Sequence, residues 1–219
     1  KMNLKTKKVK KILDDDNKPL NLGVDNNNLY FTTYHDKASN LYMYDLKNDK
    51  LTKLYSSSEL IGDFAVSDDH KYVYYFYLDE DIKNKTGLYR VKQEKNATEE
   101  LVCNDGTNQF VSPYDSNMIY FIDENGLTVS RFNTDNFKKE TWINSYTKIE
   151  NLYLANEYIY FICDGTAYCT ELTNTNEIEI PAPETTNNET NNSNNFSDYQ
   201  LQYNSIKDCY SRGSVEEIL

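Results

Sequence analysis

A tyrosine-rich segment recurs four times along this 219-residue chain at nearly constant spacing. The copies align on Tyr30, Tyr74, Tyr120 and Tyr160, so successive copies are 44, 46 and 40 residues apart. A repeat of this length accommodates four short strands and is too long for one hairpin. The spacing therefore predicts an all-β protein, a β-propeller in which each repeat folds into one small antiparallel sheet, or blade.

Each repeat divides into four strand-like runs separated by turn residues. Asn125-Gly126, between the second and third runs of the third repeat, is the strongest hairpin signal in the chain. The second runs, such as 158–162, carry large apolar side chains on both faces, which is typical of a strand packed between two sheets. An all-β sandwich is the alternative architecture, but a sandwich does not require four similar copies. The repeats favour the propeller.

The repeats also divide the chain into segments. We expect a leading half-blade at residues 1–13, a flexible Asn- and Thr-rich linker at 182–197 and a C-terminal tail at 198–219. The four repeats between them cover about 19–55, 60–103, 108–143 and 147–181. The tail is predicted to be either disordered or a strand that returns to close the ring. Because the first repeat is preceded by half a blade, the four to five blades are expected to belong to a larger ring.

Charge and hydropathy exclude two classes of partner. The formal net charge is −12 and the pI is about 4.6. Nucleic acid and anionic membrane surfaces both require a basic footprint, so neither is expected as a partner. No apolar run approaches the roughly 18 residues that a membrane span needs. We therefore expect no membrane span within this chain.

The sequence offers few residues for metal or nucleophilic chemistry. The four cysteines do not form the paired CxxC spacing of zinc sites, so no metal site and no cofactor are predicted. Cys163 and Cys169 flank one predicted hairpin, where a disulfide requires a looser loop than the tight turn expected between them. Their redox state is left open. His35 and His70 are expected on opposite propeller faces, so they do not form a shared centre.

Several segments resemble one known group of propellers. Residues 65–75, AVSDDHKYVYY, resemble the SPDGKYIYY segment of TolB-like propellers, and residues 110–120 are similar. Residues 41–46 and 87–91 resemble the third strand of the same group. Over roughly residues 1–181, the chain is similar to uncharacterised TolB-like domains of low-GC Gram-positive bacteria. The resemblance implies binding of protein or carbohydrate, and an extracytoplasmic domain at the cell surface or anchored to the membrane through an upstream segment.

Loops on one face of the propeller carry the candidate binding residues. The turns between second and third runs should meet the loops that enter the first runs on this face. Their mixture of Tyr, His, Asp and Asn suits polar recognition. The candidate residues are Tyr34, His35, Asp36, Asp79, Asp81, Asn104 and Asp105.

The function expected from these features is binding. No catalytic motif is found, so we expect a non-enzymatic binding or scaffolding domain for a protein, peptide or glycan. The alternative is a propeller-type glycosidase or lyase that uses acidic loop residues. Glycoside hydrolysis needs two carboxyl groups that converge to roughly 5–9 Å, which sequence spacing cannot show. A purely structural spacer is the third hypothesis.

Overall fold

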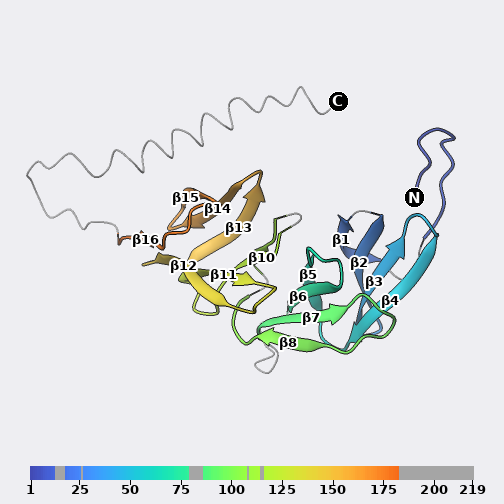
Figure 1. Cartoon of the computed structure of the whole chain (residues 1–219), viewed down its shortest axis with the longest axis horizontal. Coiled ribbons are helices and arrows are strands. Elements are labelled where there is room, and N and C mark those ends of the chain that lie inside the picture. The colour runs from blue at the N-terminus through green and yellow to red at the C-terminus, as the bar shows by residue number, and fades with distance from the viewer. Residues whose placement is uncertain (13–17, 26, 79–85, 108, 114–115, 183–219) are drawn as a thin grey trace, which may run out of the picture.

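Four β-sheets follow one another along the chain (Figure 1). The computed structural model describes residues 1–12, 18–25, 27–78, 86–107, 109–113 and 116–182. Within these ranges the regular elements are sixteen strands, and no helix is present. The sheets are arranged as the blades of a propeller, so the predicted fold class is confirmed. The expected C-terminal tail and all but one residue of the expected linker lie outside the described ranges.

Blades 1 and 2 are four-stranded antiparallel sheets in which consecutive strands pair. Blade 1 consists of β1 (Pro19–Asp25), β2 (Asn28–His35), β3 (Ala38–Asp45) and β4 (Lys50–Ser57). Blade 2 consists of β5 (Ile61–Val66), β6 (Tyr72–Tyr77), β7 (Leu88–Lys92) and β8 (Glu100–Cys103). Each sheet therefore has the up-and-down order that the four runs of a repeat predict.

Blade 3 has five strands and blade 4 has three, because the last strand of the fourth repeat joins blade 3. Blade 3 contains β9 (Phe110–Val111), β10 (Met118–Ile122), β11 (Thr128–Asn133) and β12 (Lys139–Ser145), and blade 4 contains β13 (Ile149–Ala155), β14 (Tyr158–Cys163) and β15 (Thr166–Glu171). The last strand, β16 (Ile178–Ile180), is expected to complete blade 4 but pairs in parallel with β12 of blade 3. In this position Ile180 is buried with Trp142 in the core between the two blades. Trp142 Nε1 also donates a hydrogen bond of 2.9 Å to the carbonyl of Asn174, which holds the crossing segment.

The segment expected as a leading half-blade has little regular structure. Residues 1–12 contain one isolated bridge, between Met2 and Val9. The segment is attached to blade 1 through Asp49, whose carboxylate lies 2.5 Å from Lys1 Nζ and 3.0 Å from Lys10 Nζ. The division of the chain into half-blade, repeats and linker remains a prediction.

Three apolar cores lie between the blades and explain the tyrosine repeat. Tyr30 is buried against blade 2, Tyr74 against blade 3 and Tyr120 against blade 4. Each of these three tyrosines therefore packs on the blade that follows its own, as a middle strand covered on both faces should. Tyr160 of the last repeat is only half-buried. Among the described residues no comparable core joins blade 4 to blade 1.

Blade 1 has an apolar face that no described blade covers. Gly23 faces blade 2, because a Cβ there would lie 2.9 Å from the Phe64 ring. Neighbouring side chains point to the opposite face of the sheet, and there Leu22 and Val24 are 67% and 63% exposed. The equivalent residues of blade 2, Phe64 and Val66, pack against blade 1. The uncovered face thus has the composition of a blade-to-blade contact, and membership of a larger ring remains a prediction.

Candidate functional site

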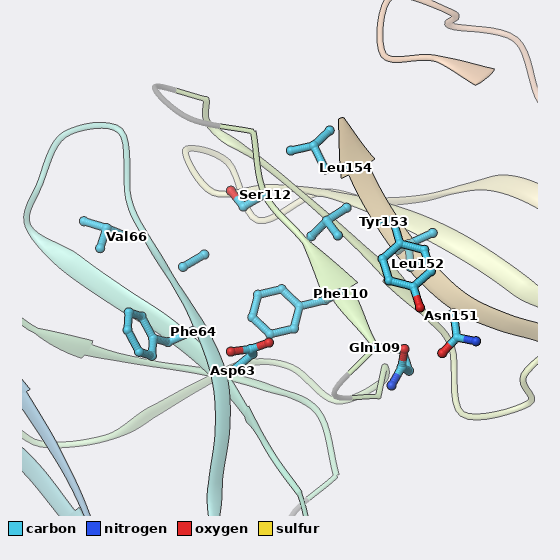
Figure 2. Close-up of a pocket in the computed structure, with 12 residues that line it drawn as sticks. Asp63, Phe64, Val66, Gln109, Phe110, Ser112, Asn151, Leu152, Tyr153 and Leu154 are labelled. Carbon is cyan, nitrogen blue, oxygen red and sulfur yellow. The ribbon is translucent and has the colours of Figure 1, made fainter. Parts of the chain in front are cut away.

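An open groove lies between the first strands of blades 2, 3 and 4 (Figure 2). Its cavity volume is about 650 Å³. The lining residues come from β5, from β9 with its flanking residues, and from β13; they are Asp63, Phe64, Ala65, Val66, Gln109, Phe110, Val111, Ser112, Asn151, Leu152, Tyr153 and Leu154. Figure 2 shows their side chains around a common space. The groove is therefore built by equivalent strands of three consecutive repeats.

A polar residue recurs at one position of the first strands. The sheet register places Gly23, Ala65, Val111 and Tyr153 opposite the four aligned tyrosines. Two residues before each of these stands a residue with a carboxylate or carboxamide side chain. These four residues, which we call the polar rung, are Asn21, Asp63, Gln109 and Asn151. The last three line the groove, and Asn21 lies on the neighbouring strand β1.

β-Bulges set the direction of three rung side chains. The register shifts between Pro19 and Leu22, between Ile61 and Phe64, and between Glu150 and Leu152. Asn21, Asp63 and Asn151 fall within these three intervals. A bulge leaves one residue outside the ladder and re-aims its side chain, and bulges are common next to functional sites. The sequence alternation alone does not reveal this shift.

Asn151 has a backbone conformation that is uncommon within a strand. Its φ is 57°, whereas the other non-glycine residues with positive φ in the described ranges lie in turns or loops. Asparagine tolerates the left-handed region better than most residues, because its short side chain can hydrogen-bond locally. Such strain costs on the order of 1 kcal/mol and tends to be found at sites where it positions a functional group. Asn151 is therefore a candidate ligand-contacting residue.

The rung side chains in the groove are exposed and have no polar partner among the residues that the structure describes. Within the described ranges, neither Asp63, Gln109 nor Asn151 makes a side-chain hydrogen bond or ion pair. Tyr153, 57% exposed, also has none within those ranges. Their oxygen and nitrogen atoms are therefore free to bond to solvent or to a ligand.

Aromatic side chains form the apolar part of the groove. Phe110 packs against Phe76 of blade 2 with ring centroids 5.1 Å apart, which fixes the short strand β9. Phe64 lies against β1, where the absence of a side chain on Gly23 allows the close approach. Both rings remain partly exposed. The groove thus combines rigid aromatic surface with adaptable polar groups.

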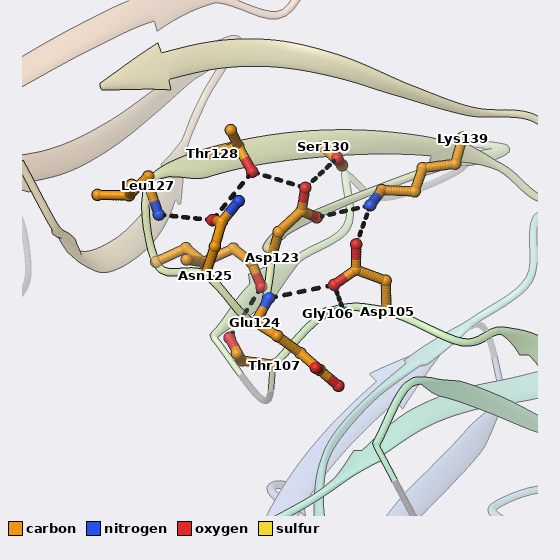
Figure 3. A network of polar contacts seen from close by, with 11 residues as sticks. Asp105, Gly106, Thr107, Asp123, Glu124, Asn125, Leu127, Thr128, Ser130 and Lys139 are labelled. Atoms are coloured by element: carbon orange, nitrogen blue, oxygen red, sulfur yellow. Dashed lines mark hydrogen bonds and ion pairs between the residues drawn. The ribbon is translucent and has the colours of Figure 1, made fainter. Parts of the chain in front are cut away.

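An ion-pair network fixes the loop that leads into β9 (Figure 3). The ammonium of Lys139 pairs with Asp105 and lies 3.1 Å from Asp123 Oδ1. The other oxygen of Asp123 accepts hydrogen bonds from the hydroxyl groups of Thr128 and Ser130, at 2.6 and 3.0 Å. The network connects three parts of blade 3 to the loop and so positions Gln109, a few residues further on.

Asp105 has its charge satisfied within this network. Its Oδ1 accepts from the backbone N–H groups of Gly106 and Glu124, at 2.7 and 3.1 Å. Burial raises the pKa of Asp105, but the hydrogen bonds from Lys139 and from the two N–H groups outweigh it, so the pKa lies below its ordinary value. Asp105 therefore holds the loop that leads into β9 in place.

The other residues singled out from the sequence lie away from the groove. Tyr34, His35 and Asp36 are exposed at the β2–β3 turn, where His35 Nδ1 lies 3.0 Å from Asp36 Oδ2. Asn104 is exposed in the loop after β8. Asp79 and Asp81 lie outside the described residues, and none of the five described candidates lines the groove. Recognition through these face loops remains a prediction.

Cys103 and Cys163 are free thiols, and the described part of the chain assembles no metal centre. Cys163 faces the core shared with blade 3, whereas Cys169 pairs with Tyr160 across the sheet and points to the opposite face. Since the two side chains lie on opposite faces of one sheet, they form no disulfide with each other. Within the described ranges no group of three His, Cys, Asp or Glu side chains is placed to hold a metal ion.

His70 connects blades 1 and 2. Its Nδ1 lies 2.6 Å from Oδ2 of Asp25, a buried residue at the end of β1. His70 has a φ of 53° in the β5–β6 turn, which turns the ring toward blade 1. The contact therefore links two blades through residues that are 45 positions apart in the sequence.

Comparisons with known proteins support the fold alone. No known protein family and no curated protein matches this chain. Among solved structures it is similar to the dihydro-heme d1 dehydrogenase NirN in complex with DHE, with a TM-score of 0.52 and 11% identity over 72% of this chain and 35% of that one. At this identity the likeness supports a propeller architecture and says nothing of activity.

Two further solved structures show weaker similarity. An auxiliary nutrient binding protein from Bacteroides thetaiotaomicron has a TM-score of 0.46 and 14% identity, over 65% of this chain and 35% of that one. An uncharacterized protein from Listeria monocytogenes has a TM-score of 0.41 and 8% identity, over 73% of this chain and 55% of that one. This chain therefore spans 35% of the length of two of the three structures and about half of the third.

Proposed function

We propose that this chain is a non-enzymatic binding or scaffolding domain that recognises a protein, peptide or glycan in the groove between β5, β9 and β13. The observation that carries the proposal is that Asp63, Gln109 and Asn151 line the groove without a polar partner in the described protein. Concave sites with apolar walls and a few converging polar groups are where proteins bind ligands. The bulges and the left-handed Asn151 support the same interpretation.

The carboxylates of the described groove favour binding over hydrolysis. A glycosidase needs two carboxyl groups flanking the scissile bond. Asp63 is the one carboxylate among the residues that line the groove. Asp105 and Asp123 lie outside the groove lining, and both carboxylates are paired with Lys139. This arrangement supplies no acid–base pair for the glycosidase alternative.

The face loops and the location complete the proposal. Tyr34, His35, Asp36 and Asn104 would extend the recognition surface beyond the groove, since each is exposed. A position outside the cytoplasm, at the cell surface, rests on the resemblance to TolB-like propellers alone. In the described part of the chain, no helix has the length and apolar character needed to cross a membrane.

Binding and catalysis are tested with the same purified chain. It is immobilised and screened against arrays of peptides and oligosaccharides, and hits are measured by calorimetry. The bound oligosaccharides are then incubated with the protein and analysed for new reducing ends. We expect saturable binding without product. Product release that Asp63→Asn abolishes would establish the enzyme alternative, and no binding to either array would contradict the proposal.

A further inference from the structure

We infer that the groove takes a neutral, hydroxyl-rich ligand, a glycan chain without acidic sugars, and that the polar rung supplies one hydrogen-bonding side chain from each blade that lines the groove. This inference rests on the proposed function, because it names the ligand class for the same groove. It is carried by four features: the chemistry of the rung, the charge of the groove, the exposed aromatic surface and the interrupted strand edges.

The rung matches hydroxyl groups in its hydrogen-bonding capacity. The carboxamides of Gln109 and Asn151 each donate and accept, and the carboxylate of Asp63 accepts. A sugar hydroxyl donates one hydrogen bond and accepts others, so each of these side chains finds a partner on a polyol. Because the three side chains lack partners in the described protein, no internal hydrogen bond has to be broken on binding.

Charge argues against an acidic ligand. No Lys, Arg or His is among the lining residues, and Asp63 contributes a negative charge. The whole chain carries a formal net charge of −12, which adds repulsion of the same sign. A phosphate, sulfate or uronate group in the groove would therefore meet an uncompensated like charge. A neutral ligand meets no such penalty.

Aromatic rings provide the surface that the apolar faces of sugar rings require. Tyr153 on β13 is 57% exposed, and Phe110 on β9 and Phe64 on β5 are partly exposed. Figure 2 shows the Phe110 ring and the Tyr153 side chain on different strands of the same groove. Flat rings held by the strands supply contact area at little cost in conformational entropy. Rigid aromatic surface beside carboxamides suits a ligand that has both hydroxyl groups and C–H faces.

The strand edges disfavour an extended peptide. Peptides commonly bind β-domains by adding a strand to a free edge, through a regular ladder of main-chain hydrogen bonds. β5 and β13 are interrupted by bulges at Asp63 and Asn151, a device that blunts edges against strand addition. β9 is only two residues long. Recognition in this groove is therefore expected to use side chains, which is how a glycan is bound.

The inference is tested by calorimetry with the full 219-residue chain. The neutral probes are cellohexaose, mannohexaose and N-acetylchitohexaose; the anionic probe is hexagalacturonate, and a panel of unstructured decapeptides is the peptide probe. Asn151→Gly removes a rung carboxamide and tolerates the positive φ. Asn156→Gly is the matched control, because Asn156 is an exposed asparagine with a φ of 54° at the β13–β14 turn, outside the groove lining. Gln109→Ala tests the rung on a different blade.

We expect at least one neutral hexasaccharide to bind and hexagalacturonate to bind at least tenfold more weakly. Asn151→Gly and Gln109→Ala should each weaken binding by about tenfold, or about 1.4 kcal/mol, while Asn156→Gly leaves it unchanged. Circular dichroism establishes whether each variant is folded. If only one of the two rung variants folds, its affinity alone tests the role of the rung.

Three results would overturn the inference. If a neutral hexasaccharide binds and neither rung variant changes its affinity, the ligand lies outside the groove. Binding of hexagalacturonate or decapeptides without binding of any neutral probe would refute the ligand class and leave the binding proposal standing. Absence of binding to every probe would overturn both.

Discussion

Replacing Lys139 with methionine should expose the repulsion that its ammonium neutralises (Figure 3). In the native protein this group pairs with Asp105 and with the buried Asp123. Methionine retains the apolar stem and removes the charge, so two carboxylates are left facing each other. Removing one partner of a buried ion pair costs about 3–5 kcal/mol. Because the Lys139 side chain is 27% exposed, solvent screening reduces the expected loss to about 2 kcal/mol at pH 7.

The loss should depend on pH with a definite sign. The pKa of Asp105 is lower in the folded protein than its ordinary value, in part because of the hydrogen bond from Lys139. This carboxylate therefore contributes stability that is fully present above its unfolded pKa, about 3.9, and is lost as the pH falls through the lower folded pKa. The difference between native protein and Lys139→Met should then be largest at neutral pH and shrink below about pH 4.

Urea unfolding at pH 7 and at pH 3 measures both quantities. Lys138→Met is the matched control, because Lys138 is the preceding residue, is largely exposed and pairs with Glu140 at the surface. We expect the control to lose less than about 1 kcal/mol. A Lys139→Met variant as stable as the control at pH 7, or one whose deficit is the same at both pH values, would refute this account of the network.

Three other perturbations have expected outcomes. Gly87→Ala should lower the free energy of unfolding by about 2–3 kcal/mol, since Gly87 has a φ of 112° and a Cβ there would lie 2.3 Å from the carbonyl oxygen of Cys103. Gly165→Ala is the control: its φ is 70° but a Cβ there meets open space, so it should cost about 1 kcal/mol. Equal losses for the two variants in urea unfolding would contradict this. The single Trp142 is 0% exposed, so native fluorescence should be blue-shifted and move to the red in one step on unfolding; a solvent-exposed spectrum for the native protein would be inconsistent with the core. Burial raises the pKa of the Cys163 thiol, so it should react with a thiol reagent only as the protein unfolds, and rapid native labelling at Cys163, located by mass spectrometry, would disagree.

The blades could be predicted from the repeat because the aligned tyrosines occupy equivalent packing positions. Tyr30, Tyr74 and Tyr120 each fill the space between their own blade and the next, so the pattern along the chain reports the packing directly. The position of β16 was not predictable in the same way. Its alternation fits any edge strand, and the choice of β12 depends on the burial of Ile180 beside Trp142, which only the assembled blades provide.

The groove was less accessible to sequence reasoning than the blades. The sequence identifies Asp105 only as a polar loop residue, because its partner Lys139 is 34 residues away and nothing in the local sequence indicates the pair. The sequence alternation does not show the polar rung, because bulges insert one residue before the aligned strand positions and break the alternation at Asp63 and Asn151. Aligning the first strands of all repeats on their tyrosines would have revealed the recurring polar position.

A structure of the complex tests the central claim most directly. The chain is crystallised with the neutral hexasaccharide that binds most tightly, and the position of the sugar is determined. We predict that it lies between β5, β9 and β13, with hydroxyl groups bonded to Asp63, Gln109 and Asn151. A hexasaccharide bound instead at the β2–β3 turn or the loop after β8, with the groove holding only water, would contradict the account.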